Sequence, residues 1–479
     1  MRRHLFLLAL ASFVSPDPFH WHSCLDSPAD PDIQCGFLTV PLDHRHPNDN
    51  RRTIDIVVRR VRVPHSVGTI VLNPGGPGVS GALEATHDLA DYLGGTHDIL
   101  GFDPRGVGAS RQLRCPPVPS ATLALPIDVP ATRRIWKTLL NACAVRDGAF
   151  AQYMSTALVA RDMDLIRAAL GDPVLHYFGV SYGTYLGITY ANMFPDRVGR
   201  FVLDSIVDPT VFAKSTFECF LLGIPASETI FQDFVTACEA AGPTKCALAD
   251  ASATRPYLAR RIVAFVASMD KQPMHLPSGD ILTGNDVRSE LSYYPPSMWP
   301  PLASQLSEWM AGKGFGTLKY DMQLETNVYL SNDSCDHAPT DLNATMAKAT
   351  ASSPLLGPAR VASDWQATLW TTSTAIERFA GPWNATLRQR IVLLHTKVDP
   401  NTPLKGAYHL AAVMGEQNAV LVTRDGYGHV ATQSEPSECL DRVVTDFFNH
   451  GMYPAAGTNC PVDETPFGLF SWPLAVATS

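Results

Sequence analysis

The chain has 479 residues, of which 46% are hydrophobic and 17% charged, a balance typical of a globular protein with a large core. Its net charge of -9 comes from 37 Lys and Arg against 46 Asp and Glu. The sequence contains no dense run of basic residues that could bind along a phosphate backbone. These figures exclude collagen-like, coiled-coil and disordered proteins, and we expect no nucleic-acid partner.

The N-terminus resembles a short secretory signal. Two arginines precede an apolar run over residues 5–14, with small residues where a signal peptidase would cut. We therefore interpret residues 1–15 as a signal segment, with a buried N-terminal helix as the alternative. The run is too short to cross a bilayer, so no membrane span is predicted.

Cysteines and glycosylation sequons indicate the same compartment as the signal segment. Ten cysteines, an even number, favour disulfides over free thiols in an exported chain. Acceptor sequons for N-glycosylation begin at Asn332, Asn343 and Asn384. Together these features predict a secreted, extracellular protein.

Six short apolar runs that end in turn residues are predicted to be buried strands: 68–73, 97–103, 174–179, 200–206, 391–396 and 418–423. Continuous apolar runs are typical of a parallel sheet covered by helices on both faces. Helical patterns over residues 156–170 and 182–194 lie between strands, and residues 37–63 are expected to form an antiparallel edge hairpin. The alternation predicts the α/β class, with a mostly parallel, doubly wound sheet.

The interval from residue 209 to residue 388 interrupts this alternation with several helical patterns and Pro-rich turns. Because predicted strands flank the interval on both sides, we interpret it as a helical lid inserted over the carboxyl edge of the sheet. The predicted organisation is a signal segment over 1–15, a core over 16–208, the insertion over 209–388 and the rest of the core over 389–479.

Residues 179–183 read Gly-Val-Ser-Tyr-Gly, directly after a predicted strand and directly before a predicted helix. Small flanking residues are needed because the turn is sharp enough to strain the serine and expose its hydroxyl above the sheet. An ordinary strand-to-helix turn is the alternative. We predict Ser181 as a nucleophile, which requires a histidine base and an acid that orients it.

Asp399 and His429 each follow a predicted strand, at the same edge of the sheet as Ser181. Their order along the chain, serine, acid and histidine, is the order expected with this type of turn. Asp204 and Asp208 also follow a strand and are alternative acids. Asp399 is preferred because its strand comes directly before that of the histidine.

Residues 73–78 read Asn-Pro-Gly-Gly-Pro-Gly after the first long strand, where donors for a tetrahedral oxyanion belong. Glycines let the backbone approach a substrate, and prolines stiffen the loop. We predict that the backbone N–H groups of Gly76 and Tyr182 are the donors, with a plain Gly/Pro turn as the alternative. The chemistry needs no cofactor, and no metal site is predicted.

Six motifs occur along the chain in this order: CGFLTVPLDH, NPGGPGVSG, GFDPRGVGAS, FGVSYGTYLGITYANMFPDRVGRFVLD, KVDPNTP and GYGH. They resemble the tripeptidyl aminopeptidase-like branch of the proline iminopeptidase family of α/β-hydrolases, over nearly the whole chain. The resemblance implies the α/β-hydrolase fold, a triad of Ser181, Asp399 and His429, and an exopeptidase that releases short N-terminal peptides or residues. An esterase or metabolite hydrolase with the same triad is the alternative, and a non-catalytic binding protein is a third.

The chain departs from this family at two positions beside the triad. Ser205 stands where members usually have glycine after Leu-Asp, and Val430 follows His429 where a small residue is common. Both are expected to alter the shape of the acyl-binding pocket. Arg105, in the motif Asp-Pro-Arg-Gly, is expected to make an ion pair beneath the site.

Proximity along the chain and the resemblance suggest four disulfides: Cys24–Cys35, Cys115–Cys143, Cys238–Cys246 and Cys439–Cys460. Cys219 and Cys335 are then left to tie the insertion together. A peptide substrate with a free N-terminus needs carboxylates that hold its ammonium group. The insertion offers four candidates that the sequence does not rank, Glu218, Glu228, Glu290 and Glu308. The oligomeric state is not indicated.

Overall fold

The computed structural model describes residues 17–468, except residues 48, 50, 117–129, 253, 255, 278, 280, 314–323, 336–340 and 371–373. The predicted signal segment over residues 1–15 lies outside the described residues.

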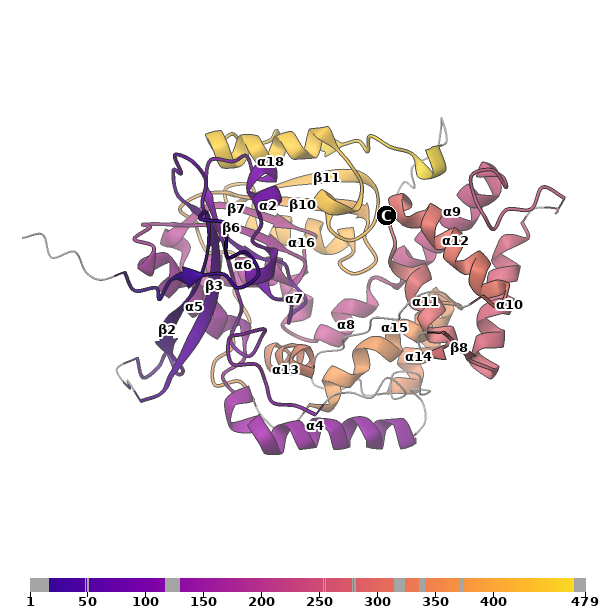
Figure 1. The fold of residues 1–479 in the computed structure, drawn as a ribbon, viewed down its shortest axis with the longest axis horizontal. Coiled ribbons are helices and arrows are strands. Elements are labelled where there is room, and N and C mark those ends of the chain that lie inside the picture. Colours follow the sequence, from indigo (N-terminus) through magenta and orange to yellow (C-terminus); the bar gives the residue numbers. More distant parts are fainter. Residues whose placement is uncertain are drawn as a thin grey trace, which may run out of the picture.

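A ten-stranded sheet forms the centre of the molecule (Figure 1), in the order β1-β2-β3-β5-β4-β6-β7-β10-β11-β12. The strands from β5 to β12 are parallel, and β1, β2 and β3 add an antiparallel edge. Their bounds are β1 His22–Ser23, β2 Ile33–Pro41, β3 Thr53–Val61, β4 Thr69–Asn73, β5 Asp98–Phe102, β6 Leu175–Val180, β7 Val198–Asp204, β10 Ile391–Val398, β11 Ala419–Tyr427 and β12 Asn459–Cys460. The predicted fold class is thereby confirmed.

Helices cover both faces of the sheet, which explains the continuous apolar runs of its strands. All five residues of β4 are buried, and they alternate between two cores. Val71 joins the core formed with α5 and α6, whereas Ile70 and Leu72 join the core formed with α2 and α18. The covering helices are α2 His87–Tyr92, α5 Thr156–Ala169, α6 Tyr182–Met193, α16 Leu404–Met414 and α18 Glu438–His450.

Between β7 and β10 the chain leaves the sheet for a long helical insertion. Figure 1 shows α9 to α12 beside the sheet, α13 below it, and α14 and α15 at the lower right next to α11. The elements are α7 Pro209–Phe212, α8 Thr216–Leu221, α9 Ile224–Ala241, α10 Leu258–Lys271, β8 Met274–His275, β9 Ile281–Leu282, α11 Gly284–Tyr293, α12 Trp299–Met310, α13 Leu324–Asp333, α14 Leu342–Ser352 and α15 Gly357–Asp364.

The insertion has a hydrophobic core of its own that also takes in the end of the sheet. Val398 of β10 and Tyr427 of β11 belong to the same cluster of buried residues as Phe234 and Trp299 of the insertion. The Tyr427 hydroxyl also donates a hydrogen bond to Asp233 of α9, at 2.9 Å. The insertion is therefore anchored at the carboxyl ends of β10 and β11.

Two further helices precede β6. The short helix α1 covers Gly81–Glu84, and the long helix α4 covers Pro130–Ala151. Sequence analysis did not predict α4. Trp136, Leu140 and Cys143 bury one side of it at helical spacing, and Figure 1 shows the helix below α13 and α14.

Arg105 makes the ion pair that its motif predicts. Its side chain is fully buried, and its guanidinium donates to both carboxylate oxygens of Asp162 on α5, at 2.7 and 2.6 Å. The same guanidinium donates to the carbonyl of Leu42 at 2.8 Å, and His44 also contacts Asp162 at 2.8 Å. This cluster ties the turn after β2 and the loop after β5 to α5.

The structure contains the four suggested disulfides, Cys24–Cys35, Cys115–Cys143, Cys238–Cys246 and Cys439–Cys460. Cys219 and Cys335 are not bonded to each other, so the expectation that they tie the insertion together is wrong for this structure. Cys219 is buried on α8, whereas Cys335 is exposed just after α13.

One glycosylation prediction is incompatible with the fold. Asn332 is 2% exposed, and its side-chain nitrogen donates to the carbonyls of Ala151 and Met154 at 2.8 and 2.6 Å. A glycan would be attached to that nitrogen, so Asn332 is not an acceptor in the folded protein. Asn343 and Asn384 are exposed and remain predictions.

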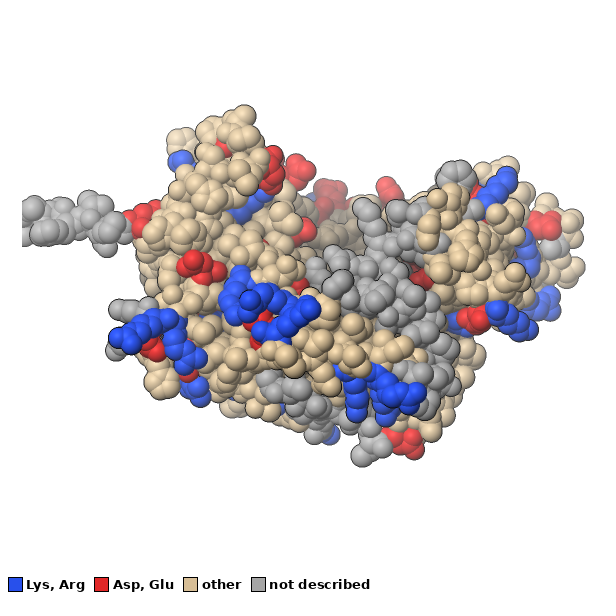
Figure 2. Space-filling view, turned by 60° about the horizontal axis from the view of Figure 1, so that its bottom comes forward, with Lys and Arg blue, Asp and Glu red and all other residues tan. Residues whose placement is uncertain are grey.

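Charge is distributed in small groups over the face seen in Figure 2. Lys and Arg side chains form separate groups there, with uncharged surface and acidic side chains between them, and the described part of this face shows no continuous basic stretch. Within the described residues, no helix combines the length and the hydropathy required to cross a bilayer.

The buried Arg105–Asp162 pair leads to a prediction about stability. Replacement of Arg105 with Met leaves the Asp162 carboxylate without its strongest partner, and we expect the free energy of unfolding to fall by about 3–5 kcal/mol. Chemical denaturation followed by tryptophan fluorescence measures the change. Arg161→Met is the matched control, because the Arg161–Glu377 pair is partly exposed and its loss should cost about 0–1 kcal/mol. Equal losses in the two variants would contradict the prediction.

Candidate active site

Ser181 lies at the sharp turn between β6 and α6 in a conformation that side chains rarely adopt. Its φ is 57° and its ψ is -122°. Glycine is required at positions 179 and 183, because a side chain at either position would clash with a backbone oxygen. A Cβ on Gly179 would come within 2.5 Å of the Gly183 carbonyl oxygen, and one on Gly183 within 2.4 Å of the Asn73 carbonyl oxygen. Strain of this kind costs about 1–3 kcal/mol and is typical of functional turns.

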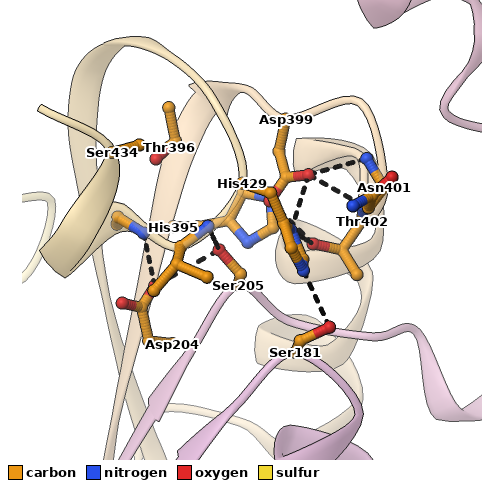
Figure 3. Close-up of polar contacts among 12 residues, drawn as sticks. Ser181, Asp204, Ser205, His395, Thr396, Asp399, Asn401, Thr402, His429 and Ser434 are labelled. Carbon is orange, nitrogen blue, oxygen red and sulfur yellow. Dashed lines mark hydrogen bonds and ion pairs between the residues drawn. The ribbon is translucent and has the colours of Figure 1, made fainter. Parts of the chain in front are cut away.

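His429 and Asp399 meet Ser181 at the carboxyl edge of the sheet (Figure 3). The Nε2 atom of His429 is 2.7 Å from the Ser181 hydroxyl oxygen, and its Nδ1 atom is 3.0 and 2.9 Å from the two oxygens of Asp399. The His429 side chain is 6% exposed and that of Asp399 is fully buried. With Nδ1–H donated to Asp399, Nε2 is free to accept the serine proton.

Asp399 is held in its ionised form. Burial alone would raise its pKa, but the contact with His429 and the backbone N–H of Thr402 outweigh burial and lower the pKa to about 2. The backbone N–H groups of Asn401 and Thr402 donate to one oxygen at 2.8 and 2.9 Å, and the Thr402 hydroxyl donates to the other at 2.8 Å. The carboxylate therefore remains charged and fixed in place over the neutral pH range.

Asp204, one of the two alternative acids, does not contact the ring of His429. It binds the backbone shortly after His429 instead. Its carboxylate accepts from the N–H groups of Ala431 and Thr432, both at 2.9 Å. The Ser205 hydroxyl accepts from the N–H of Val430, also at 2.9 Å, so the two departures from the family pattern contact each other.

Asp208, the other alternative acid, lies away from His429. Its carboxylate contacts His409 at 2.8 Å and accepts from the backbone N–H of Thr210 at 3.0 Å. The geometry therefore brings only Asp399, among the three candidate acids, to the ring of His429.

The glycine-rich loop over residues 73–78 lies against Ser181. A Cβ on Gly75 would come within 2.9 Å of the Ser181 Cβ and 3.2 Å of the Tyr182 nitrogen, so this close approach requires glycine. Gly76 lines the same cavity as Ser181. Tyr182 is the first residue of α6, and the N–H groups of a first helical turn have no partner within the helix. Both predicted oxyanion donors thus lie beside the nucleophile.

A cavity of about 640 Å³ opens at Ser181 and His429. Its charged lining consists of Glu84 at the end of α1 and Asp88 on α2, and the described lining residues include no Lys or Arg. Both carboxylates are exposed. Neither residue was predicted, because the candidate carboxylates were expected in the insertion, whereas Glu84 and Asp88 precede β5.

The four carboxylates that sequence analysis named in the insertion lie elsewhere. Glu218, Glu228, Glu290 and Glu308 are not among the described residues that line the cavity. Glu228 bonds instead to Gln232 and Ser353. The insertion does reach the site through Pro295, whose Cβ would be 2.9 Å from a Cβ on Gly428, the residue before His429.

This arrangement has the parts that acyl transfer requires. A serine hydroxyl contacts one imidazole nitrogen, the other imidazole nitrogen contacts an ionised carboxylate, and the glycine-rich loop lies against the serine. None of these steps needs a metal or an organic cofactor.

Known proteins resemble the chain along most of its length. Residues 68–240 match the family described as α/β hydrolase fold, and residues 353–460 match the family described as TAP-like protein. The chain is 34% identical to the tripeptidyl aminopeptidase of Streptomyces lividans over 307 residues, which are 58% of this chain and 54% of that protein. The chain thus spans about half the length of this relative.

Two mycobacterial relatives are matched almost from end to end. The serine protease Hip1 of Mycobacterium tuberculosis is 27% identical over an alignment 493 positions long, gaps included, that covers 92% of this chain and 91% of that protein. The carboxylesterase B of the same organism is 30% identical over an alignment 497 positions long that covers 94% of this chain and 91% of that protein.

The contacts of Ser181 lead to a prediction that needs no knowledge of the substrate. A fluorophosphonate probe should label the protein at Ser181, and Ser181→Ala should abolish the labelling. Asp399→Asn should slow labelling by about 10³–10⁴-fold, because the imidazole loses the partner that fixes its tautomer. Rates of labelling, measured by in-gel fluorescence, test the prediction.

Asp208→Asn is the matched control for this experiment, since its carboxylate contacts His409 rather than His429. It should be labelled at close to the wild-type rate. Slowing as severe as that of Asp399→Asn would show that the assignment of the acid is wrong.

Proposed function

The chain belongs to the tripeptidyl aminopeptidase-like α/β-hydrolases, and on this basis we propose that it is a serine exopeptidase that releases short peptides or single residues from peptide N-termini. The observation that carries the proposal is the contact of Ser181 with His429 and of His429 with Asp399, at hydrogen-bonding distances.

The proposed reaction is acyl transfer through an ester on Ser181. The serine oxygen attacks the carbonyl carbon of the scissile bond, and the Nε2 atom of His429 takes the serine proton. Asp399 stabilises the resulting imidazolium, and the N–H groups of Gly76 and Tyr182 bind the oxyanion. His429 returns the proton to the leaving amine, and a water activated by His429 then hydrolyses the ester.

The charge of the cavity supports a substrate that carries an amine. Glu84 and Asp88 line the cavity of the nucleophile, and the described lining residues include no Lys or Arg. The ammonium group of a peptide N-terminus would gain charge-assisted hydrogen bonds from such carboxylates. The distance between these two carboxylates and Ser181 would then determine how many residues are released from the N-terminus of the substrate.

An esterase is the second candidate function, favoured by the similarity to carboxylesterase B over 91% of that protein. The same three side chains hydrolyse esters and amides, so the triad does not decide between them. Substrates of this second class would be short esters or small amides that need no amine for binding.

We further propose that the protein is secreted. Four disulfides are typical of oxidising compartments outside the cytosol. The signal segment over residues 1–15 and glycans at Asn343 and Asn384 belong to the same proposal. Mass spectrometry of the protein from a secreting host, with the mature N-terminus and any glycans identified, tests all three points.

Substrate class is tested by turnover of three matched probes. Tripeptide anilides with a free N-terminus should be cleaved, and the same anilides with an acetylated N-terminus should be cleaved far more slowly, because acetylation removes the positive charge. Short acyl esters of nitrophenol are the third probe. Efficient ester hydrolysis together with inert anilides would replace the exopeptidase by the esterase.

The role of the two carboxylates is tested by the double variant Glu84→Gln, Asp88→Asn. We expect KM for the free-amine anilide to rise by about fivefold, the effect typical of exposed charge pairs, with kcat nearly unchanged. Hydrolysis of short esters should be unaffected. Glu308→Gln, an exposed carboxylate of the insertion outside the cavity lining, is the control. An unchanged KM in the double variant would refute the role.

A further inference from the structure

The insertion helix α13, Leu324–Asp333, contacts the core at three places around Ser181. The Thr326 hydroxyl donates to the carbonyl of Pro77 at 2.6 Å, and the Tyr329 hydroxyl donates to the carbonyl of Arg105 at 2.6 Å. Asp333, at the end of the helix, accepts two hydrogen bonds from α5. These contacts join segments about 180 to 250 residues apart in sequence.

The contact of Thr326 falls on the loop that carries one predicted oxyanion donor. Pro77 directly follows Gly76, and both Gly75 and Gly76 have φ values near 100° that only glycine adopts readily. Two consecutive glycines leave the direction of the Gly76 N–H poorly fixed by the chain itself. The Thr326 hydroxyl holds the peptide group that follows Pro77 and so anchors the loop beside Gly76.

The contacts of Asp333 lead to the other predicted donor. Its carboxylate accepts from the backbone N–H and the hydroxyl of Thr156, at 2.9 and 2.6 Å. The Thr156 oxygen also contacts the hydroxyl of Tyr182. When Asp333 is ionised, Thr156 gives its single hydroxyl proton to Asp333, so the Tyr182 hydroxyl then donates to Thr156. The side chain of the residue after the nucleophile is thereby tied to α13.

Aromatic packing strengthens the same attachment. The ring of Tyr182 lies 6.2 Å from that of Tyr329 on α13 and 6.3 Å from that of Phe212 on α7. Tyr182 is 3% exposed, so its ring is enclosed on one side by the insertion. A fixed ring fixes the start of α6, because Tyr182 is the first residue of that helix.

We propose that α13 positions the oxyanion hole: Thr326, through Pro77, aligns the N–H of Gly76, and Asp333, through Thr156, aligns the N–H of Tyr182. The insertion is then part of the catalytic architecture as well as a cover. The inference rests on the proposed acyl-transfer function and deepens it. Thr326 and Asp333 are positioning residues, since neither touches the reacting atoms.

The ionisation state of Asp333 sets the pH range in which this arrangement holds. Burial raises its pKa to about 7, against the opposing effect of its hydrogen bonds with Thr156 and the charge of Arg378. The phenols near it, Tyr182, Tyr185 and Tyr329, stay neutral because burial raises the pKa of each. A protonated Asp333 would donate to Thr156 and leave the Tyr182 proton without its acceptor.

The linked effect on stability has a definite sign. A carboxyl with a higher pKa in the folded state than in the unfolded state favours folding below about pH 4, and this contribution is lost as the pH rises through about 7. In Asp333→Asn this contribution is absent at every pH. The decrease in melting temperature from pH 5 to pH 8 should therefore be smaller in the variant than in the wild type, and an equal decrease would show that Asp333 does not titrate in this range.

The positioning role is tested with Thr326→Val and Thr326→Ser in the full chain, with a nitrophenyl ester as substrate. Thr326→Val keeps the shape but loses the hydroxyl, and we expect kcat to fall by about tenfold with little change in KM, since a misaimed donor weakens the transition state alone. Thr326→Ser should restore kcat. Thr350→Val on α14, where the hydroxyl bonds only within its own helix, is the control and should behave as the wild type.

A second measurement separates positioning from a general loss of structure. A short alkyl boronic acid forms a tetrahedral adduct with Ser181 that mimics the oxyanion, so its Ki should rise in Thr326→Val and Asp333→Asn by the factor by which kcat/KM falls. Unchanged kcat and Ki in Thr326→Val, or failure of Thr326→Ser to restore activity, would overturn the proposal. A wild-type protein that hydrolyses neither ester nor anilide and reacts with no fluorophosphonate would instead refute the proposed function itself.

Discussion

The candidate site depends on one contact, the 2.7 Å approach of the Ser181 hydroxyl to the His429 imidazole across 248 residues of sequence. The sheet makes this contact possible. Strands β6, β7, β10 and β11 are neighbours and run parallel, so the residues that follow them emerge at one edge. The nucleophile follows β6, the acid follows β10, and the base follows β11. Parallel pairing therefore converts three distant positions into one cluster.

Strained backbone is concentrated in this cluster and is held by buried hydrogen bonds. Ser181, Ser205 and Val430 all have positive φ, which is uncommon for serine and a clear outlier for a β-branched valine. The Ser205 hydroxyl bonds the Val430 N–H, and Asp204 bonds the two N–H groups that follow. The strand between those of the nucleophile and the acid thus supplies no catalytic group but fixes the loop that carries His429.

The insertion shares in the construction of the site, because its contacts fall on the loops that bear the chemistry. Its core includes the ends of β10 and β11, Pro295 packs beside Gly428, and α13 bonds the glycine-rich loop. The packing of the insertion therefore bears both on the glycine-rich loop and on the strand ends that precede Asp399 and His429.

The sequence alone determined what depends on short-range pattern. Apolar runs marked the parallel strands, Gly-Val-Ser-Tyr-Gly marked the turn of Ser181, and short separations along the chain suggested the four disulfides that the structure contains. Asp399 could be preferred over Asp204 because strand order restricts which residues reach one edge of the sheet. The strand and turn predictions rest on a few neighbouring residues, whereas the preference for Asp399 rests on the order of the strands.

Tertiary packing decided the rest. The burial of Asn332, the separation of Cys219 from Cys335, the exposed carboxylates of Glu84 and Asp88 in the cavity, and the contacts of α13 all arise between segments with no sequence relation to each other. A sequon or a carboxylate looks the same in sequence whether it is buried or exposed. Only the packing of the insertion against the sheet determines which of these groups face solvent, core or substrate.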